Sequence, residues 1–128
     1  MIQENSWRPC KCNRAKEVGW VCEECGASRE SGATIVGHHI VPKSSAGQNS
    51  SNNCRLRCDL CEQAAHIFSS DGNPAEWKME AYIATRREYQ KQLGRRINGR
   101  DNSQLCKDLR IAWRRGARED LDVVALYA

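Results

Sequence analysis

The sequence predicts a small α+β fold in which a β-hairpin and a helix form the core and basic helices follow. Residues 21–42 combine turn-forming residues with β-branched ones, which is typical of a short hairpin. Residues 59–68 suit an amphipathic helix, as do two longer stretches after residue 73. One Cys-x2-Cys pair begins the hairpin region and another begins the first helix. A metal ion bound by both pairs would hold the two elements together.

The segments around these elements follow from their residue types. In residues 1–20 we expect at most a short helical turn. Residues 42–53 are dense in Pro, Gly, Ser and Asn, which predicts an irregular loop. Asn52 or Asn53, at the end of that loop, can cap the helix that covers at least residues 59–68.

The C-terminal half predicts two more helices. Asn73 can cap a helix that begins at Pro74 and runs to about Leu93, because proline is favoured at the first helical position. A last helix is expected over roughly 103–118. Apolar residues gather on one side of each helix, and we expect a core there from Met79, Tyr82, Ile83, Tyr89, Leu93, Leu105, Leu109, Ala112 and Trp113.

Length and composition limit the class of protein. The chain has 128 residues, 40% of them hydrophobic, with a mean hydropathy of -0.73, which allows one domain with a modest core. It contains no apolar run of about 18 residues and no N-terminal apolar stretch of the signal-peptide kind. We therefore expect a cytoplasmic protein with no membrane partner. We expect residues 1–19 to be an N-terminal extension, 20–70 the core, and 71–128 a helical basic extension.

The eight cysteines of the chain suit metal binding better than disulfides, because the cytoplasm is reducing. Cys22 and Cys25 form one knuckle, and Cys58 and Cys61 form another. Four thiolates in this spacing are the closed tetrahedral set that structural Zn2+ prefers. The other four are expected to be ordinary reduced cysteines, with a second ion at the C-x-C pair as the alternative: Cys10, Cys12, Cys54 and Cys106.

Residues with metal-binding or acid–base chemistry lie between and just after the knuckles: His38, His39, Asn53, Glu62 and His66. Adjacent residues of a strand point to opposite faces, so the two neighbouring histidines are expected to diverge. Glu62 and His66 are four residues apart, so on a helix they share a face and can bind one metal ion. The order and spacing, with "HHIVP" between two cysteine knuckles, resemble the HNH endonucleases. The resemblance is to the zinc-stapled branch related to restriction-type and phage nucleases.

That resemblance covers about residues 20–68 and implies a ββα-metal (His-Me finger) core around one divalent cation. By the resemblance, His38 and His66 bind the catalytic ion. His39 corresponds to the general base, which deprotonates the water that attacks a phosphodiester. Asn53 corresponds to the asparagine that orients the base and braces the loop. The ion would stabilise charge on the scissile phosphate and the departing 3′-oxygen, leaving 5′-phosphate and 3′-hydroxyl ends.

Glu62 departs from the family pattern, which usually has His or Asn directly after the second knuckle. A carboxylate is a hard oxygen ligand, so its presence favours Mg2+ or Mn2+ as the catalytic ion. A smaller departure is "SAG" at residues 45–47, where a Gly-Gly pair is commoner.

The positive charge of the chain is concentrated near its C-terminus. Residues 74–118 contain 12 Lys and Arg against 5 Asp and Glu, which suits a polyanion such as DNA. Basic residues near the site and on the helices are therefore candidates for phosphate contacts: Lys43, Arg55, Arg57, Arg86, Arg87, Arg95, Arg96, Arg110, Arg114 and Arg115.

One alternative comes from another class of function. A non-catalytic zinc module that binds DNA or a protein would use the four cysteines and the basic surface, but would give His39 and Asn53 no role. Within the nuclease class, the sequence does not separate single-strand nicking from double-strand cutting. A homodimer or a phage or restriction partner protein is compatible with either.

Overall fold

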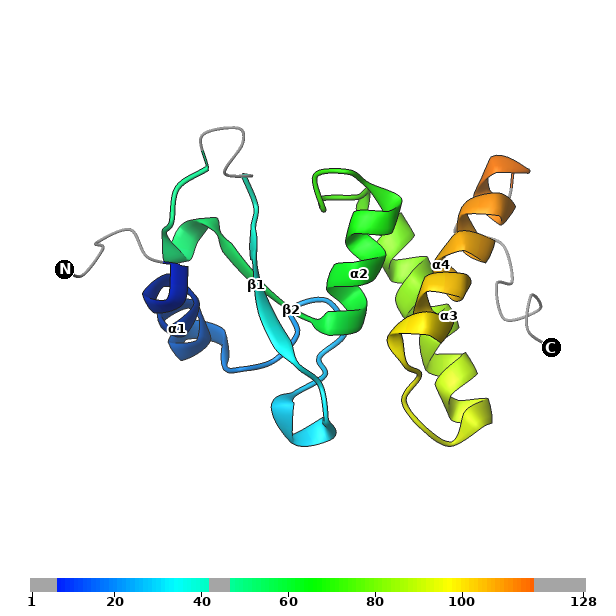
Figure 1. Cartoon of the computed structure of the whole chain (residues 1–128), viewed down its shortest axis with the longest axis horizontal. Helices are drawn as coiled ribbons and strands as arrows, with labels where there is room; N and C mark the ends of the chain where they lie inside the picture. The colour runs from blue at the N-terminus through cyan, green and yellow to red at the C-terminus, as the bar shows by residue number, and fades with distance from the viewer. Residues whose placement is uncertain (1–6, 42–46, 117–128) are drawn as a thin grey trace. The chain divides into compact units, whose positions relative to one another are not determined.

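The computed structural model describes residues 7–41 and 47–116 (Figure 1). The chain divides into two compact units, residues 1–62 and 63–128, and each is described by itself. Among the described residues, no helix has the length and apolar character needed to cross a membrane. The predicted α+β class is confirmed, with a two-stranded antiparallel sheet and helices.

The first unit is built on strands β1 (Ile35–His39) and β2 (Cys54–Cys58). They pair antiparallel, with Ile35 opposite Cys58 and His39 opposite Cys54. The predicted hairpin within residues 21–42 is therefore wrong in its pairing, since β1 finds its partner beyond the loop. The first knuckle is closed instead by an isolated bridge between Val21 and Ser28.

Helix α1 (Trp7–Val18) lies next to β2, where the sequence predicted no more than a helical turn. Its buried residues Cys10 and Ala15 contribute to the core of this unit. Arg14 fastens the helix to the first knuckle, because its guanidinium hydrogen-bonds to both carboxylate oxygens of Glu23. These long-range contacts stabilise a helix whose own sequence is a weak helical signal.

Helix α2 (Asp59–Phe68) follows β2 without a break and covers the residues for which a helix was predicted. The predicted cap at Asn52 or Asn53 is wrong, because β2 stands between those residues and the helix. The amide of Asp59 donates to the carbonyl of Thr34 at 2.9 Å, which ties the start of the helix to the start of β1. The strand pair and this helix together form the predicted ββα arrangement.

The second unit contains helices α3 (Glu76–Leu93) and α4 (Gly99–Arg114). The predicted cap at Asn73 is wrong. Ala75 occupies the N-cap without a side-chain hydrogen bond, and the amide of Asn73 instead donates to the carboxylate of Asp71 at 2.9 Å. Helix α4 begins earlier than predicted because the side chain of Asn98 caps it, accepting from the amide of Asp101 at 2.8 Å.

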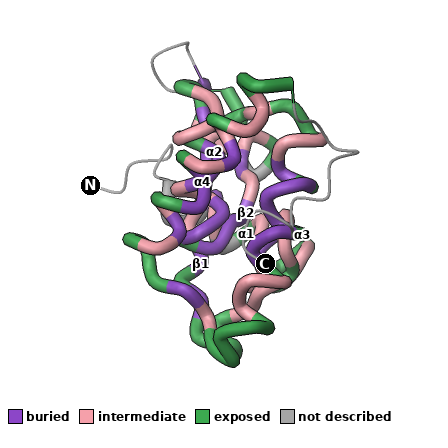
Figure 2. The backbone as a smooth tube through the Cα atoms, turned by 90° about the vertical axis from the view of Figure 1, so that its right-hand side faces the viewer, coloured by how far each residue is buried: buried purple, intermediate pink, exposed green. Residues whose placement is uncertain are grey.

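In Figure 2, which colours the backbone by the burial of each residue, buried and exposed residues alternate along the helices, as expected for amphipathic packing. Tyr82 is fully buried and donates to Asn102 Oδ1 at 2.6 Å, while Arg86 Nη1 donates to the Tyr82 hydroxyl at 2.8 Å. Asn102 in turn donates to Gln63 Oε1 at 2.8 Å, so a buried polar chain links α3, α4 and the second half of α2. Leu93, expected in the core, is 38% exposed.

Candidate active site

The first knuckle, Cys22 and Cys25, and the second, Cys58 and Cys61, come together as the spacing predicts. Their four sulfurs all lie within 4.8 Å of one another, and Cys25 Sγ is 3.8 Å from Cys58 Sγ. Zinc–sulfur bonds of about 2.3 Å in a tetrahedron put neighbouring sulfurs about 3.8 Å apart. The cluster therefore fits a structural zinc ion that joins the first knuckle to the junction of β2 and α2.

The backbone around the cluster favours thiolates. The amides of Glu24 and Cys25 donate to Cys22 Sγ at 3.4 Å, and the amide of Cys61 donates to Cys58 Sγ at 3.3 Å. The hydrogen bond between the Cys22 and Cys58 sulfurs lowers the pKa of Cys58 to about 6, whereas hydrogen bonds with Cys25 and Cys58 raise the pKa of Cys22 above its usual range, so in the absence of a metal ion the Cys58 sulfur is the one that deprotonates first. A metal ion binds the deprotonated sulfur, so donors aimed at sulfur prepare the site for it.

Two of the remaining cysteines have the character of ordinary buried thiols. Burial raises the pKa of Cys54 to about 11 and that of Cys106 to about 12. Cys10 is also buried, whereas the side chain of Cys12 lies outside the described part of the chain. Thiols that resist deprotonation are poor ligands and poor nucleophiles, so the high pKa values favour a packing role for Cys54 and Cys106.

A second cluster of ligand atoms lies at β1 and α2. His38 is 5% exposed, and its Nδ1 is 3.1 Å from Glu62 Oε1. His66 follows Glu62 by one turn of α2, and one ligand atom from each of the three lies within 4.8 Å of the others. The three side chains therefore form a cluster that could hold a metal ion.

A buried arginine connects this cluster to the first knuckle. Arg57 is 3% exposed, and its Nη1 lies 3.8 Å from Glu62 Oε2. Its Nε donates to Glu24 Oε1 at 3.3 Å, and Arg55 Nε donates to the same oxygen at 2.6 Å. Glu24 stands between the two cysteines of the first knuckle, so this knuckle holds the Arg57 guanidinium beside the Glu62 carboxylate.

His39 takes a different direction from its neighbour His38. Its Nε2 lies 2.7 Å from Asn49 Oδ1, on the limb of the loop that returns to β2. Sequence reasoning missed Asn49, because nothing in "QNSSNN" separates it from the asparagines at 52 and 53. The sequence allowed a search of this loop for a polar partner of His39, but it could not show which asparagine lies within hydrogen-bond distance.

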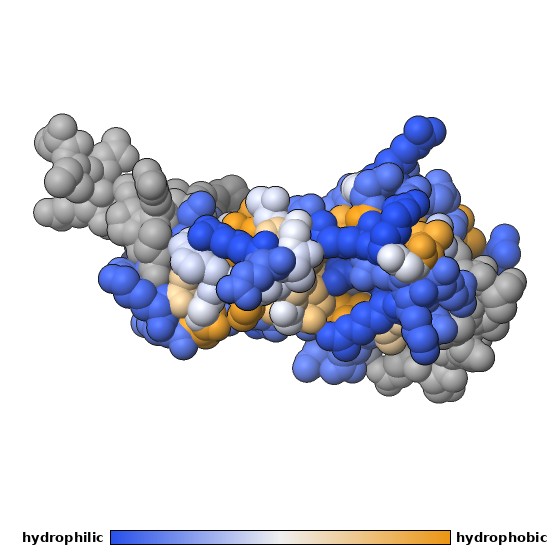
Figure 3. All heavy atoms as spheres, turned by 90° about the horizontal axis from the view of Figure 1, so that it is seen from below, coloured by the Kyte–Doolittle hydropathy of each residue, from blue (hydrophilic) through white to orange (hydrophobic). Residues whose placement is uncertain are grey.

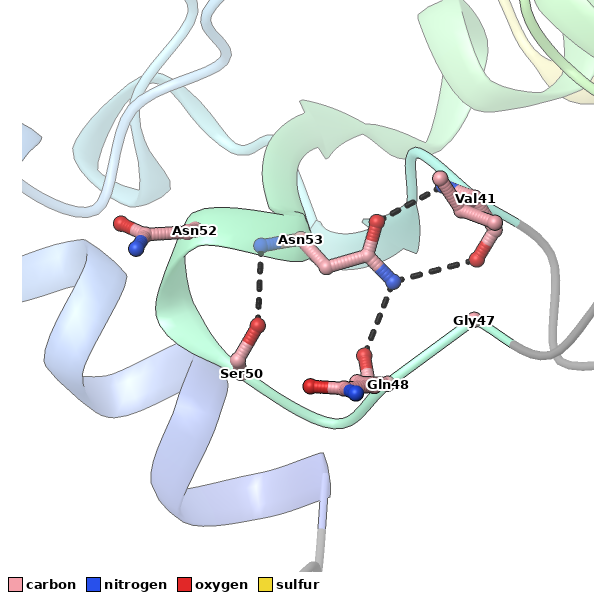
Figure 4. Close-up of a pocket in the computed structure, with 6 residues that line it drawn as sticks. All are labelled: Val41, Gly47, Gln48, Ser50, Asn52 and Asn53. Atoms are coloured by element: carbon pink, nitrogen blue, oxygen red, sulfur yellow. Dashed lines mark hydrogen bonds between the residues drawn. The ribbon is translucent and has the colours of Figure 1, made fainter.

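Asn53 braces the loop (Figure 4). Its Oδ1 accepts from the amide of Val41 at 2.7 Å, and its Nδ2 donates to the carbonyls of Val41 at 3.1 Å and Gln48 at 2.8 Å. The side chain thus fastens the residue two places after His39 to the residue just before Asn49. Beside this brace is an open hollow of about 260 Å³ lined by Val41, Gly47, Gln48, Ser50, Asn52 and Asn53.

The candidate DNA contacts differ in exposure. Arg57 and Arg86 are each 3% exposed and are engaged inside their own units. Four others are exposed on or after the helices of the second unit: Arg87, Arg95, Arg114 and Arg115. Arg96 and Arg110 are half-buried, and Lys43 lies outside the described residues. Figure 3 shows a face that is mostly hydrophilic, with separate small apolar patches.

Comparison with known proteins confirms the resemblance in the sequence. The HNH endonuclease family model matches residues 22–67. The matched segment begins at Cys22, the first residue of the four-cysteine cluster, contains both knuckles and the histidine pair, and ends one residue after His66. No curated protein and no solved structure matches the chain. The match supports nuclease-type activity, metal binding and DNA as the substrate.

Proposed function

Because residues 22–67 match the HNH endonuclease family, we propose that the protein is a metal-dependent DNA endonuclease with His39 as its general base. The observation that carries the proposal is the divergence of two adjacent imidazoles. His38 faces Glu62 in the candidate metal cluster, whereas His39 faces Asn49 in the loop. One histidine is thereby committed to a metal, and its neighbour is available for proton transfer.

The two environments suit these two roles. His38 is buried, as befits a ligand that must hold one orientation, while His39 is only partly buried and can reach solvent and substrate. In the proposed reaction His39 accepts a proton from water, whose oxygen attacks phosphorus. The bond between phosphorus and the 3′-oxygen then breaks, and the departing oxygen takes up a proton from solvent, which leaves a 5′-phosphate and a 3′-hydroxyl. A divalent ion bound by His38, Glu62 and His66 would stabilise negative charge on the phosphate and the leaving oxygen.

The two clusters differ in ligand chemistry, which assigns a different ion to each. Four sulfurs select zinc, in agreement with its role as a structural staple. A carboxylate with two imidazoles accepts harder ions, and Mg2+ or Mn2+ are the ions proposed there. A reducing cytoplasm, the location proposed here, would keep the four thiols available for zinc.

DNA binding is proposed to use the exposed arginines of the second unit. Arg87, Arg95, Arg114 and Arg115 are exposed, whereas Arg86 is buried, and guanidinium groups bind phosphates well. Arg96 and Arg110 are half-buried, and Arg55 is paired with Glu24, so these three are proposed to contribute less to DNA binding. Arg57 is proposed to position Glu62 rather than to contact DNA, because its guanidinium is buried.

A supercoiled-plasmid assay tests the proposal. Wild-type protein should nick or linearise the plasmid with Mg2+ or Mn2+ and leave it intact with EDTA, and His39→Ala should lose at least about 100-fold in rate. Asn52→Ala, an exposed change in the same loop, is the control and should retain activity. Nicked circles alone would indicate a monomer that cuts one strand, and direct linear product would indicate a pair. A zinc-loaded wild type that binds DNA but leaves it intact with every ion would identify a non-catalytic module.

A further inference from the structure

The side chain of Asn49 makes a contact that the assignment of His39 as general base does not explain. Asn49 Oδ1 lies 2.7 Å from His39 Nε2, a good distance for a hydrogen bond. Asn49 is half-buried, and it stands on the opposite limb of the loop from His39. The contact therefore spans the loop rather than joining neighbours in sequence.

The chemistry of the two groups fixes the position of one proton. An amide oxygen can only accept a hydrogen bond, so the Nε2 atom of His39 must donate. A neutral imidazole carries a single N–H, and with that proton on Nε2 the lone pair is on Nδ1. A general base needs a bare nitrogen, so the contact prepares His39 for proton transfer through Nδ1.

We propose that Asn49 is a positioning residue that holds His39 in the tautomer protonated at Nε2 and in one ring orientation. The proposal rests on the assignment of His39 as the base. Asn49 touches neither substrate nor metal in this account and acts only through the imidazole. An amide is suited to the task because its oxygen accepts a hydrogen bond from the protonated ring nitrogen without bringing a negative charge near the phosphate.

The loop brace keeps Asn49 in reach of His39. Asn53 donates to the carbonyl of Gln48, the residue before Asn49, and binds both backbone groups of Val41 on the other limb. The amide of Ile40 also donates to the carbonyl of Asn53 at 3.2 Å. The two asparagines thus have separate tasks, since Asn53 holds the two limbs of the loop and Asn49 holds the imidazole.

The test combines a spectroscopic readout with kinetics on the zinc-loaded full chain. The chain has 3 histidines, so the imidazole nitrogens of His39 can be assigned in a ¹⁵N spectrum by comparison with His39→Gln. Wild type should show the Nε2-protonated tautomer. Asn49→Leu should show a mixture and lose about 10- to 100-fold in kcat, with unchanged KM and Mn2+ affinity. Asn49→Asp, which keeps an acceptor but adds a negative charge near the phosphate, should keep the tautomer and recover part of the rate.

Asn52→Leu is the matched control and should leave both the spectrum and kcat unchanged. An Nδ1-protonated His39 in wild type, or a wild-type tautomer and rate in Asn49→Leu, would overturn the proposal while leaving the nuclease assignment intact. A wild-type protein with no nuclease activity would instead overturn the proposed function. The ¹⁵N spectra would then still decide whether Asn49 sets the tautomer.

Discussion

His38 Nδ1 lies 3.1 Å from Glu62 Oε1, so a buried histidine of β1 and a carboxylate in the first turn of α2 form one pair of candidate ligands. Strand β1, which carries His38, pairs with β2, and β2 runs directly into α2, which carries Glu62. A carboxylate stands where the family usually has His or Asn, and its contact with His38 gives the substitution a definite place in the site.

Replacing Glu62 is expected to change both the rate and the choice of ion. Glu62→Ala should lower the Mg2+-dependent rate by at least about 10-fold, because even outer partners of metal ligands are worth that much. Glu62→His should restore cleavage with softer ions such as Co2+ or Ni2+ more than with Mg2+. Rates measured across a series of divalent ions check this, with Glu80→Gln, an exposed acid on α3, as control. Unchanged ion preference in both variants would remove Glu62 from the metal shell.

The zinc staple predicts a sharp difference between two buried cysteines. Cys58→Ser should lose the ion and the cooperative melting transition of the first unit. Structural zinc contributes about 10–16 kcal/mol in small domains, which exceeds the usual net stability of about 5–15 kcal/mol. Cys106→Ala, fully buried in α4, should keep one zinc per chain and melt only a few degrees lower. Metal analysis and calorimetry check both, and a normal melting transition in zinc-free Cys58→Ser would contradict the staple.

Two neighbouring arginines on α3 are expected to differ in what they contribute: one to stability and the other to DNA binding. Arg86→Ala removes the 2.8 Å hydrogen bond to the Tyr82 hydroxyl inside the second unit and should cost about 1–3 kcal/mol of stability. Arg87→Ala, at an exposed position, should leave the melting temperature unchanged and weaken DNA binding. The slope of log affinity against log salt should fall by about 1 for Arg87→Ala. Salt titrations of a DNA duplex decide this, and equal effects of both variants on melting would contradict the burial difference.

The contact between Glu23 and Arg14 predicts loss of stability in acid. Burial by itself would raise the pKa of Glu23, but hydrogen bonds from Arg14 and from the Leu56 amide lower it below its usual range. With the folded-state pKa below the unfolded-state value of about 4.3, the contribution is present above that value. It disappears as the pH falls through the lower, folded-state pKa.

Glu23→Gln should therefore be less stable than wild type at pH 7, by about 1–2 kcal/mol, with the difference shrinking below about pH 4. Zinc release also weakens the fold in acid, so the measured quantity is the difference between the two proteins across the same pH series. A difference that grows as the pH falls would contradict the assigned direction.

The sequence predicted the local parts of this fold well. Helix α2 covers the minimum range predicted for it, Asp59–Phe68, because the apolar period is complete within those residues, whereas the predicted cap at Asn52 or Asn53 precedes a strand. The four-cysteine cluster was also predicted from local spacing, since each Cys-x2-Cys knuckle spans only four residues. The pairing of β1 with β2 was missed, because "CRLRC" adjoins a helical segment and its partner lies beyond a long loop.

The sequence also could not predict which charged side chains are buried or which residues the side chains contact. Arg57 and Arg86 looked like candidates for DNA because charge is visible in a sequence, whereas their burial depends on Glu24 and Tyr82. Asn49 carried no local signal, because its importance lies in a contact across the loop. The pattern around His38 and His39 did predict their divergence, and the structure supplied the two different partners.

The separate roles of the two adjacent histidines are tested most directly by Mn2+ affinity, measured by electron paramagnetic resonance on the zinc-loaded protein. His38→Ala should bind Mn2+ at least about 10-fold more weakly than wild type, because it lacks a proposed ligand. His39→Ala should bind Mn2+ within about twofold of wild type while losing cleavage, because the base is proposed to stand outside the metal shell. Equal losses of Mn2+ affinity in both variants, or a loss confined to His39→Ala, would contradict the account.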